Sequence, residues 1–310
     1  MADISNPIFH DETKAIAHLE ASRWPDGPYC PYCGSFNVHR MGGKTQAGMF
    51  LCNDCREKFT ARVGSVMERS HIPVHKWLLA IHLMAASKKG ISSKQLQRML
   101  GISYKSAWFL SMRIREAMRA EGVGPIGGEG KIVESDETFV GGKKKNVHKG
   151  KPEPKKHAVH ALVERGGQIR AKHVADVTAK TLKKNLKEMA DRKSALHTDD
   201  SLANLSIGKG FADHQTVAHT LGEYVRGDAH TQTVESFFAI LKRGVFGSFH
   251  SVSEQHLQRY VDEFAFRWNT RQSLGMDDFA RAAELLRAIE GKRLTYRRPD
   301  EDAQRGKDDA

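Results

Sequence analysis

The four cysteines are the feature that most constrains this fold. They form two C-x-x-C pairs, Cys30 with Cys33 and Cys52 with Cys55, separated by a short stretch with hairpin character. This is the spacing of a tetrahedral four-cysteine zinc site. A disulfide framework would need an oxidising compartment, which nothing in the sequence suggests, and a redox C-x-x-C needs no second pair. We therefore predict a structural zinc ribbon over residues 30–70, with all four thiolates as ligands.

The charge of the chain indicates a polyanionic partner. The 310 residues carry a formal net charge of +12, which favours nucleic acid first and an anionic membrane second. The positive charge is concentrated in Lys143–Lys156, Lys180–Lys193, Lys242 with Arg243, and Arg293–Arg298. No apolar run is long enough to cross a bilayer and no signal peptide is visible. We expect a cytoplasmic, nucleoid-associated bacterial protein without membrane contact.

Helical patterns flank the ribbon. Residues 1–29 predict an N-terminal helical segment, and residues 71–120 predict a helical DNA-binding region. In that region, helices at 92–101 and from 103 onwards are joined by a tight turn with glycine, which is typical of a helix-turn-helix. The second helix carries Lys105, Arg113 and Arg115 as candidate DNA contacts. A plain helical hairpin fits the pattern equally well, and the neighbouring ribbon and basic charge favour DNA binding.

A glycine-rich linker at 121–130 precedes a predicted α/β catalytic domain at 131–290, and a charged tail follows at 291–310, predicted to be disordered. The predicted order is three strands (131–140, 157–164, 169–177), a helix at 178–192, a strand at 194–198 and then helices. Carboxylates lie within the first strand (Asp136), after the fourth (Asp199, Asp200) and on a helix at 230–244 (Glu235). This is the layout of a ribonuclease H-like domain whose acidic side chains converge on divalent cations.

The chain also resembles a known family along nearly its whole length. The motifs that carry the likeness are RWPDGPYCPYCG at 23–34, IPVHKWLL at 72–79, SKKGISS at 87–93, DETFVGGK at 136–143, GEYVRGD at 222–228, ESFFAILKRG at 235–244 and HLQRYVDEF at 256–264. It is similar to the ISXO2-like transposases of the IS1595 insertion-sequence family.

The resemblance implies a DDE triad of Asp136, Asp199 and Glu235 that binds two Mg²⁺ (or Mn²⁺) ions for DNA strand cleavage and strand transfer. Asp199 is preferred to Asp200 because it directly follows Thr198, as in the family's Thr-Asp pattern. Lys242 matches a basic residue that contacts DNA near the scissile phosphate, and His230 would support the site. Glu134 is expected to be accessory at most.

The expected partners are double-stranded DNA, as terminal inverted repeats and as target, and further copies of the chain in a synaptic complex. Candidate DNA contacts in this domain are Lys143, Lys242 and Arg243. Two alternatives stay open. One is a domesticated regulator that binds DNA without catalysis, and the other is a ribonuclease H-like nuclease without strand transfer.

Overall fold

The computed structural model describes residues 4–43, 47–142, 155–200, 208–218, 223 and 225–295. These residues form two compact units. The first comprises the described residues of 4–86, 93–117 and 278–295, and the second those of 87–92 and 118–277. Lys143 and the predicted tail from residue 296 onwards lie outside the described residues.

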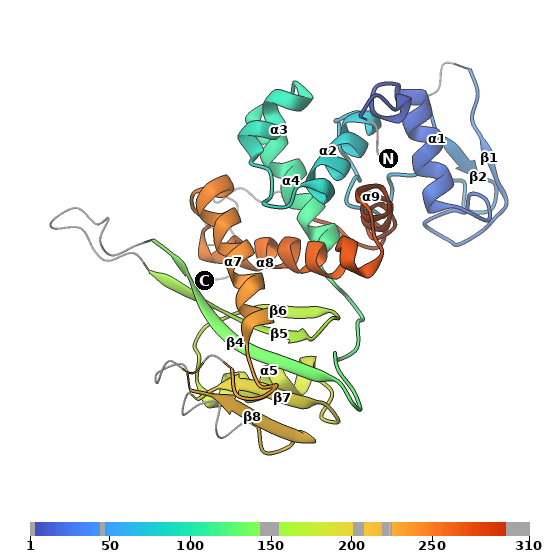
Figure 1. Cartoon of the computed structure of the whole chain (residues 1–310). Coiled ribbons are helices and arrows are strands. Elements are labelled where there is room, and N and C mark those ends of the chain that lie inside the picture. The colour runs from blue at the N-terminus through green and yellow to red at the C-terminus, as the bar shows by residue number, and fades with distance from the viewer. Residues whose placement is uncertain are drawn as a thin grey trace, which may run out of the picture. The chain divides into compact units, whose positions relative to one another are not determined.

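The first unit begins with a short zinc-ribbon-like sheet attached to helices. Its elements are η1 (Pro7–Phe9), α1 (Glu12–Arg23), β1 (Val38–Arg40), β2 (Phe50–Cys52), β3 (Lys58–Phe59), α2 (Val74–Ala86), α3 (Ser93–Leu100), α4 (Tyr104–Met118) and α9 (Asp278–Arg287) (Figure 1). The three strands are antiparallel in the order β1-β2-β3. Trp24 packs edge-on against Phe50 with ring centroids 5.5 Å apart, and Phe50 stacks on Phe59 at 5.6 Å. A core this small is typical of domains that are stabilised by a bound metal as well.

The two helices predicted for the helix-turn-helix are present as α3 and α4. Gly101 ends α3 with φ at +58°, and the Ser103 hydroxyl accepts the Ser106 N–H at 3.1 Å to begin α4. A left-handed glycine followed by a serine cap makes the three-residue turn. Whether the pair acts as a DNA-binding helix-turn-helix stays a prediction.

Helix α9 lies outside the unit to which the sequence assigned it. We predicted a catalytic domain over 131–290, but residues from 278 belong to the first unit. The Arg281 guanidinium donates to the Ala85 carbonyl oxygen at the end of α2 at 3.1 Å, and Val66 N–H donates to the Ile289 carbonyl at 3.2 Å. The amphipathic pattern of α9 predicts a buried face without saying against which partner it packs.

The second unit is built around a five-stranded mixed sheet. Its elements are β4 (Ile132–Gly141), β5 (Lys156–Glu164), β6 (Ile169–Val174), α5 (Ala179–Met189), β7 (Ala195–Asp199), β8 (Asp213–Val217), α7 (Gln232–Gly244), the π-helix η4 (Val245–Phe249), α8 (Glu254–Asn269) and η5 (Gln272–Leu274) (Figure 1). The strand order is β6-β5-β4-β7-β8. The β4–β5 and β5–β6 pairs are antiparallel, whereas β4–β7 and β7–β8 are parallel.

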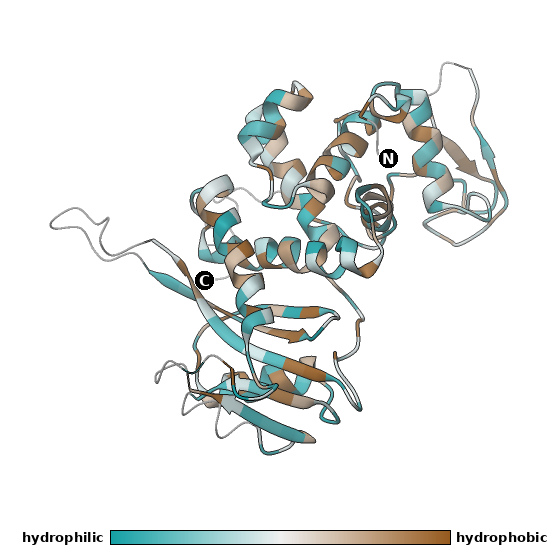
Figure 2. Ribbon diagram, in the orientation of Figure 1, coloured by the Kyte–Doolittle hydropathy of each residue, from teal (hydrophilic) through white to brown (hydrophobic). Residues whose placement is uncertain are grey.

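Strand β8 was not predicted. It lies at the sheet edge, and four of its five residues are polar, so that it is largely hydrophilic in Figure 2. A strand with four polar residues in five lacks the apolar alternation from which strands are predicted, and polar residues are common in edge strands.

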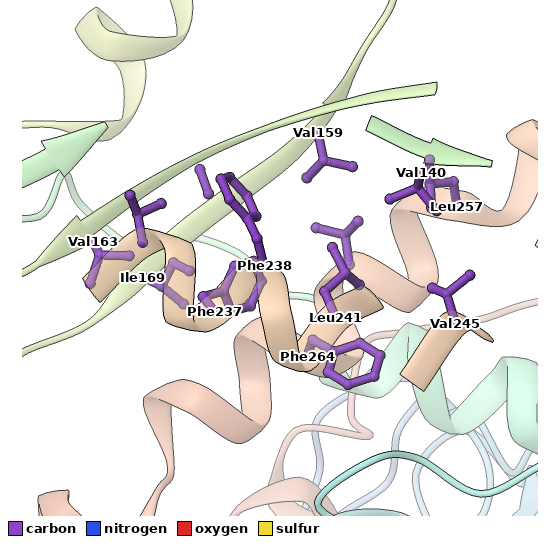
Figure 3. Close-up of a cluster of buried hydrophobic side chains, with 13 residues drawn as sticks. Val140, Val159, Val163, Ile169, Phe237, Phe238, Leu241, Val245, Leu257 and Phe264 are labelled. Carbon is purple, nitrogen blue, oxygen red and sulfur yellow. The ribbon is translucent and has the colours of Figure 1, made fainter. Parts of the chain in front are cut away.

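Helices cover both faces of the sheet. On one face, apolar residues of α7 and α8 pack against Val159, Ala161 and Val163 of β5 (Figure 3). The helix residues are Phe237, Phe238 and Leu241 of α7 with Val261 and Phe264 of α8. On the other face, Leu182 and Leu186 of α5 pack against Leu162, Val133 and Leu196. Strand residues alternate between faces, so the register decides which carboxylates lie under α7. Among the described helices, none combines the length and apolar character needed to cross a bilayer.

Candidate active site

The four cysteines of the ribbon come together. One sulfur from each lies within 4.8 Å of the others, and the Cys30–Cys55 and Cys33–Cys52 sulfurs are each 3.6 Å apart. That separation is too long for a disulfide, whose sulfurs are about 2.0 Å apart. Four sulfurs held about 2.3 Å from a central zinc ion would be about 3.8 Å apart, so the observed spacing fits a tetrahedral site.

The register of β4 and β7 brings two acidic side chains to the same face of the sheet. Glu134 pairs with His197 in the parallel ladder. Asp136 and Asp199 each lie two residues farther along, so both point to the side of Glu134 and His197, under α7. Asp200 is the next residue after Asp199, so by the same alternation it would point away from that face. Glu235 is in the first turn of α7 on that side of the sheet.

The electrostatics of Asp136 show which charges surround it. The pKa of Asp136 is raised to about 7, chiefly by burial and further by the carboxylates of Asp199 and Glu235. The Glu137 N–H and the charge of Lys242 act in the opposite direction and lower this pKa. The Glu137 N–H donates to Asp136 Oδ1 at 2.7 Å. Three carboxylates within mutual electrostatic reach favour a divalent cation, because oxygen ligands suit Mg²⁺ and the cation relieves their repulsion. The donor set therefore fits the predicted metal.

Asp200 faces another group. The pKa of Arg226 is raised by the hydrogen bond and charge of Glu223 and, to a smaller extent, by the charge of Asp200. Asp200 is not among the charges that shift the pKa of Asp136. Asp199 is thus the acid whose charge acts on Asp136, and its place in a triad stays a prediction.

Glu134 has a larger part in the site than the sequence indicated. Its carboxylate is 0% exposed and accepts from Thr233 N–H (2.8 Å), the Thr233 hydroxyl (2.7 Å), Val234 N–H (3.1 Å) and Arg165 Nε (3.0 Å). The first turn of α7, which carries Glu235, is therefore fixed to β4 through this side chain. The signal in the sequence was the shared face of Glu134 and Asp136.

Neighbouring groups extend this frame. Arg165 also donates to the Asp228 carboxylate at 3.1 Å, and His230 Nδ1 lies 3.3 Å from Glu134 Oε1. The Thr231 hydroxyl donates to Glu235 Oε1 at 3.0 Å. His230 is thus beside the acid that fixes the first turn of α7, and its supporting role stays a prediction.

The candidate DNA-binding residues separate into two groups. Lys242 is half-buried and close enough to lower the pKa of Asp136, Arg243 is exposed on the same helix, and Lys105 is exposed at the start of α4. The structure argues against Arg113, which is 8% exposed and donates to the carbonyl oxygens of Leu294 at 3.1 Å and Glu68 at 2.9 Å. Helix α4 is buried on all sides from Leu110 to its end, so Arg113 does not face solvent. Its guanidinium instead connects α4 to the backbone at Glu68 and Leu294.

Two protein families match this chain, one over the ribbon and one within the second unit. Residues 10–58 match the transposase zinc-ribbon domain of IS1595, and residues 127–269 match the ISXO2-like transposase domain. The first range contains all four cysteines, and the second contains Asp136, Asp199 and Glu235.

Two individual proteins are also similar. An uncharacterized protein in transposable element ISH50 of Halobacterium salinarum is 29% identical over 277 residues, which covers 84% of this chain and 91% of that protein. Among solved structures, the Mos1 transposase paired-end complex with left transposon end is 14% identical, covering 68% of this chain and 74% of that chain, with a TM-score of 0.29. That score is too low for a detailed comparison of the two backbones.

Proposed function

The chain belongs to the IS1595 family of insertion-sequence transposases, and we propose that it binds the terminal inverted repeats of a transposable element and catalyses metal-dependent DNA strand cleavage and strand transfer. The observation that carries the proposal is the placement of Asp136, Asp199 and Glu235. Two come from neighbouring parallel strands and the third from the helix that covers them.

The second unit supports a ribonuclease H-like assignment. Three consecutive antiparallel strands continue, after α5, into two strands parallel to β4. The carboxylates lie within β4, at the end of β7 and on α7, which is the layout that the sequence predicted.

Asp136, Asp199 and Glu235 would hold Mg²⁺ (or Mn²⁺). When bound, a pair of such ions polarises the phosphate and stabilises the attacking and leaving oxygens of a phosphodiester displacement. The protein positions the ligands: two on the sheet and one on α7, which Glu134 fixes in place. Lys242, two helical turns after Glu235, would bind a DNA phosphate beside the carboxylates.

The first unit would supply recognition of the element's ends. In this proposal the four cysteines hold a structural Zn²⁺, and α3 with α4 forms a helix-turn-helix in which Lys105 contacts DNA. A synaptic complex holds two ends, so the working form would be a dimer or a larger symmetric assembly.

The decisive experiment is cleavage and joining on a labelled duplex that carries the element's own terminal repeat, with Mg²⁺ present. We compare wild type with Glu235→Ala, Asp199→Asn and the matched neighbour Asp200→Asn. Wild type and Asp200→Asn should give cleaved and joined products, while the other two bind the same duplex and leave it intact. Binding without cleavage by all four proteins would favour a DNA-binding regulator, and cleavage without joining would favour a nuclease. Loss of activity in Asp200→Asn alone would overturn the triad assignment.

A further inference from the structure

A second cluster of metal-ligating side chains lies in the second unit. It consists of His157 on β5, His173 on β6 and Glu254 in the first turn of α8, and one ligand atom of each lies within 4.8 Å of the others. His157 Nδ1 is 3.6 Å from Glu254 Oε2, and the two imidazole centroids are 5.9 Å apart. We propose that these three side chains form a transition-metal site, with Zn²⁺ as the ion that suits them.

The cluster is separate from the three carboxylates. Val140 pairs with His157 across the sheet, and Val140 is four residues from Asp136 along β4. At a rise of about 3.3 Å per residue, that is about 13 Å. One ion cannot bridge both groups, so the cluster would be a site of its own.

The sheet places both histidines on one face. Val159 pairs with His173 in the β5–β6 ladder, and His157 lies two residues before Val159. Side chains two apart on a strand share a face, so the histidines are diagonal neighbours on adjacent strands. A continuous ladder of backbone hydrogen bonds fixes their Cα positions and leaves only the side-chain torsions to adjust.

Helix α8 brings the carboxylate to the same place. Gln258, one turn after Glu254, accepts the His173 N–H at 2.7 Å and donates to the Ala171 carbonyl oxygen at 3.3 Å. Strand β6 is at the sheet edge, so these bonds hold α8 against its free backbone groups. Leu257 is buried with Val140 in the same core (Figure 3). Both contacts keep the first turn of α8 over the two histidines.

The donor set identifies the class of ion. Imidazole nitrogen suits zinc, copper, nickel and iron, whereas Mg²⁺ prefers oxygen alone. Around a tetrahedral zinc ion, ligand atoms about 2.1 Å from the metal would be about 3.4 Å apart, which small side-chain rotations would reach from the observed spacing. An ion pair between Glu254 and a protonated imidazole would account for the position of one histidine beside the carboxylate. It would not account for the second, because two protonated imidazoles side by side repel each other.

A metal bound there would join three elements. It would tie the beginning of β5, the end of β6 and the start of α8, at the end of the sheet where β4 ends and β5 begins. Three protein ligands leave a fourth position for water. Because a preformed site binds the folded state, the ion would stabilise the second unit.

The test is calorimetric titration of the full-length protein with Zn²⁺, after the ribbon has been loaded with zinc and with excess Mg²⁺ present. Every protein carries Asp136→Asn, which weakens the carboxylate site as a competing zinc ligand set. We expect one equivalent of Zn²⁺ to bind, and this binding to be lost in His157→Gln and in His173→Gln. It should weaken at least tenfold in Glu254→Gln and stay unchanged in His71→Gln, an exposed histidine of the first unit.

Two outcomes decide the proposal without reference to transposition. Glu254 has a side chain that is 59% exposed, so its replacement leaves the core intact and reports on ligation alone. The site would be overturned if His157→Gln and His173→Gln proteins bound zinc as well as the Asp136→Asn parent and melted at the same temperature as that parent before the titration. Absence of any zinc equivalent beyond the ribbon's would overturn it as well, leaving the cluster as a histidine–glutamate ion pair.

Discussion

Removal of the Glu134 carboxylate should release the first turn of α7 from the sheet. In the folded protein this buried carboxylate accepts two backbone N–H groups of that turn, the Thr233 hydroxyl and the Arg165 guanidinium. Hydrogen bonds to a charged group contribute about 1.5–3 kcal/mol each. Breaking a buried ion pair by removing one partner costs about 3–5 kcal/mol. We therefore expect Glu134→Ala to destabilise the second unit by about 5 kcal/mol.

Glu134→Gln separates the two contributions. Both backbone N–H groups are donated to Oε2, while Arg165 and the Thr233 hydroxyl donate to Oε1. A glutamine carbonyl at the Oε2 position can still accept both N–H groups, but its amide N–H₂ would face the Arg165 donor. We expect Gln to lose the ion pair and keep most of the anchorage of α7.

The assay is hydrogen exchange at the amides of Thr233 and Val234, followed together with strand cleavage. If each amide loses about 1.5–3 kcal/mol of protection, exchange should accelerate roughly tenfold to a hundredfold in Glu134→Ala. The increase should be smaller in Glu134→Gln. Cleavage should fall in the same order, because Glu235 is on the released turn.

The control is Glu263→Gln, which removes a second fully buried carboxylate, paired with Arg267 at 2.7 Å within α8. It should lower the stability of the second unit without a selective change at the two amides of α7. Unchanged exchange at Thr233 and Val234 in Glu134→Ala, in a protein otherwise destabilised, would refute the anchoring argument.

Three other changes test separate parts of the structure. Burial lowers the pKa of His160 from its usual value to about 4, so the folded protein keeps this histidine neutral while the unfolded chain takes up a proton below about pH 6.5. Stability is therefore lost as pH falls, and His160→Gln should reduce the loss between pH 7 and pH 5 by about 2 kcal/mol in urea unfolding; an unchanged pH dependence would contradict the cause. Cys33→Ser should lose the ribbon's zinc and the protection of its strands, as measured by zinc content and hydrogen exchange, since structural zinc contributes folding free energy. Full zinc content in that variant would refute a four-thiolate site. Lys242→Ala should weaken binding to terminal-repeat DNA and reduce the slope of log K against log salt by about 0.9, whereas an equal slope would exclude a phosphate contact.

Local patterns in the sequence predicted much of this fold. The spacing of the four cysteines is enough to predict their site. The strand β4 and the helix α7 were predicted from apolar residues that recur with periods of two and 3.6 residues. The strand that ends at Asp199 was also predicted from the sequence. These signals depend on neighbours within a few residues, which a sequence displays directly.

Contacts between distant residues could not be predicted in the same way. Arg113 was expected on DNA, but it is buried against Glu68 and Leu294, which are 45 and 181 residues away. The cluster of His157, His173 and Glu254 depends on the β5–β6 register and on the docking of α8, and no spacing motif marks either one. Helix α9 has an amphipathic face whose partner, α2, lies far earlier in the chain.

Two of the three acids of β4 show how a structure decides which carboxylates would bind metal. Glu134 and Asp136 are two residues apart and share a face of the strand, so the alternation of the sequence does not distinguish them. Each Glu134 oxygen already accepts from two protein donors, so its charge and lone pairs are satisfied within the protein. Asp136 accepts the Glu137 N–H and is surrounded by the charges of Asp199, Glu235 and Lys242. A divalent cation would gain little from Glu134 and much from Asp136, so the first acid would position the helix and the second would bind the metal.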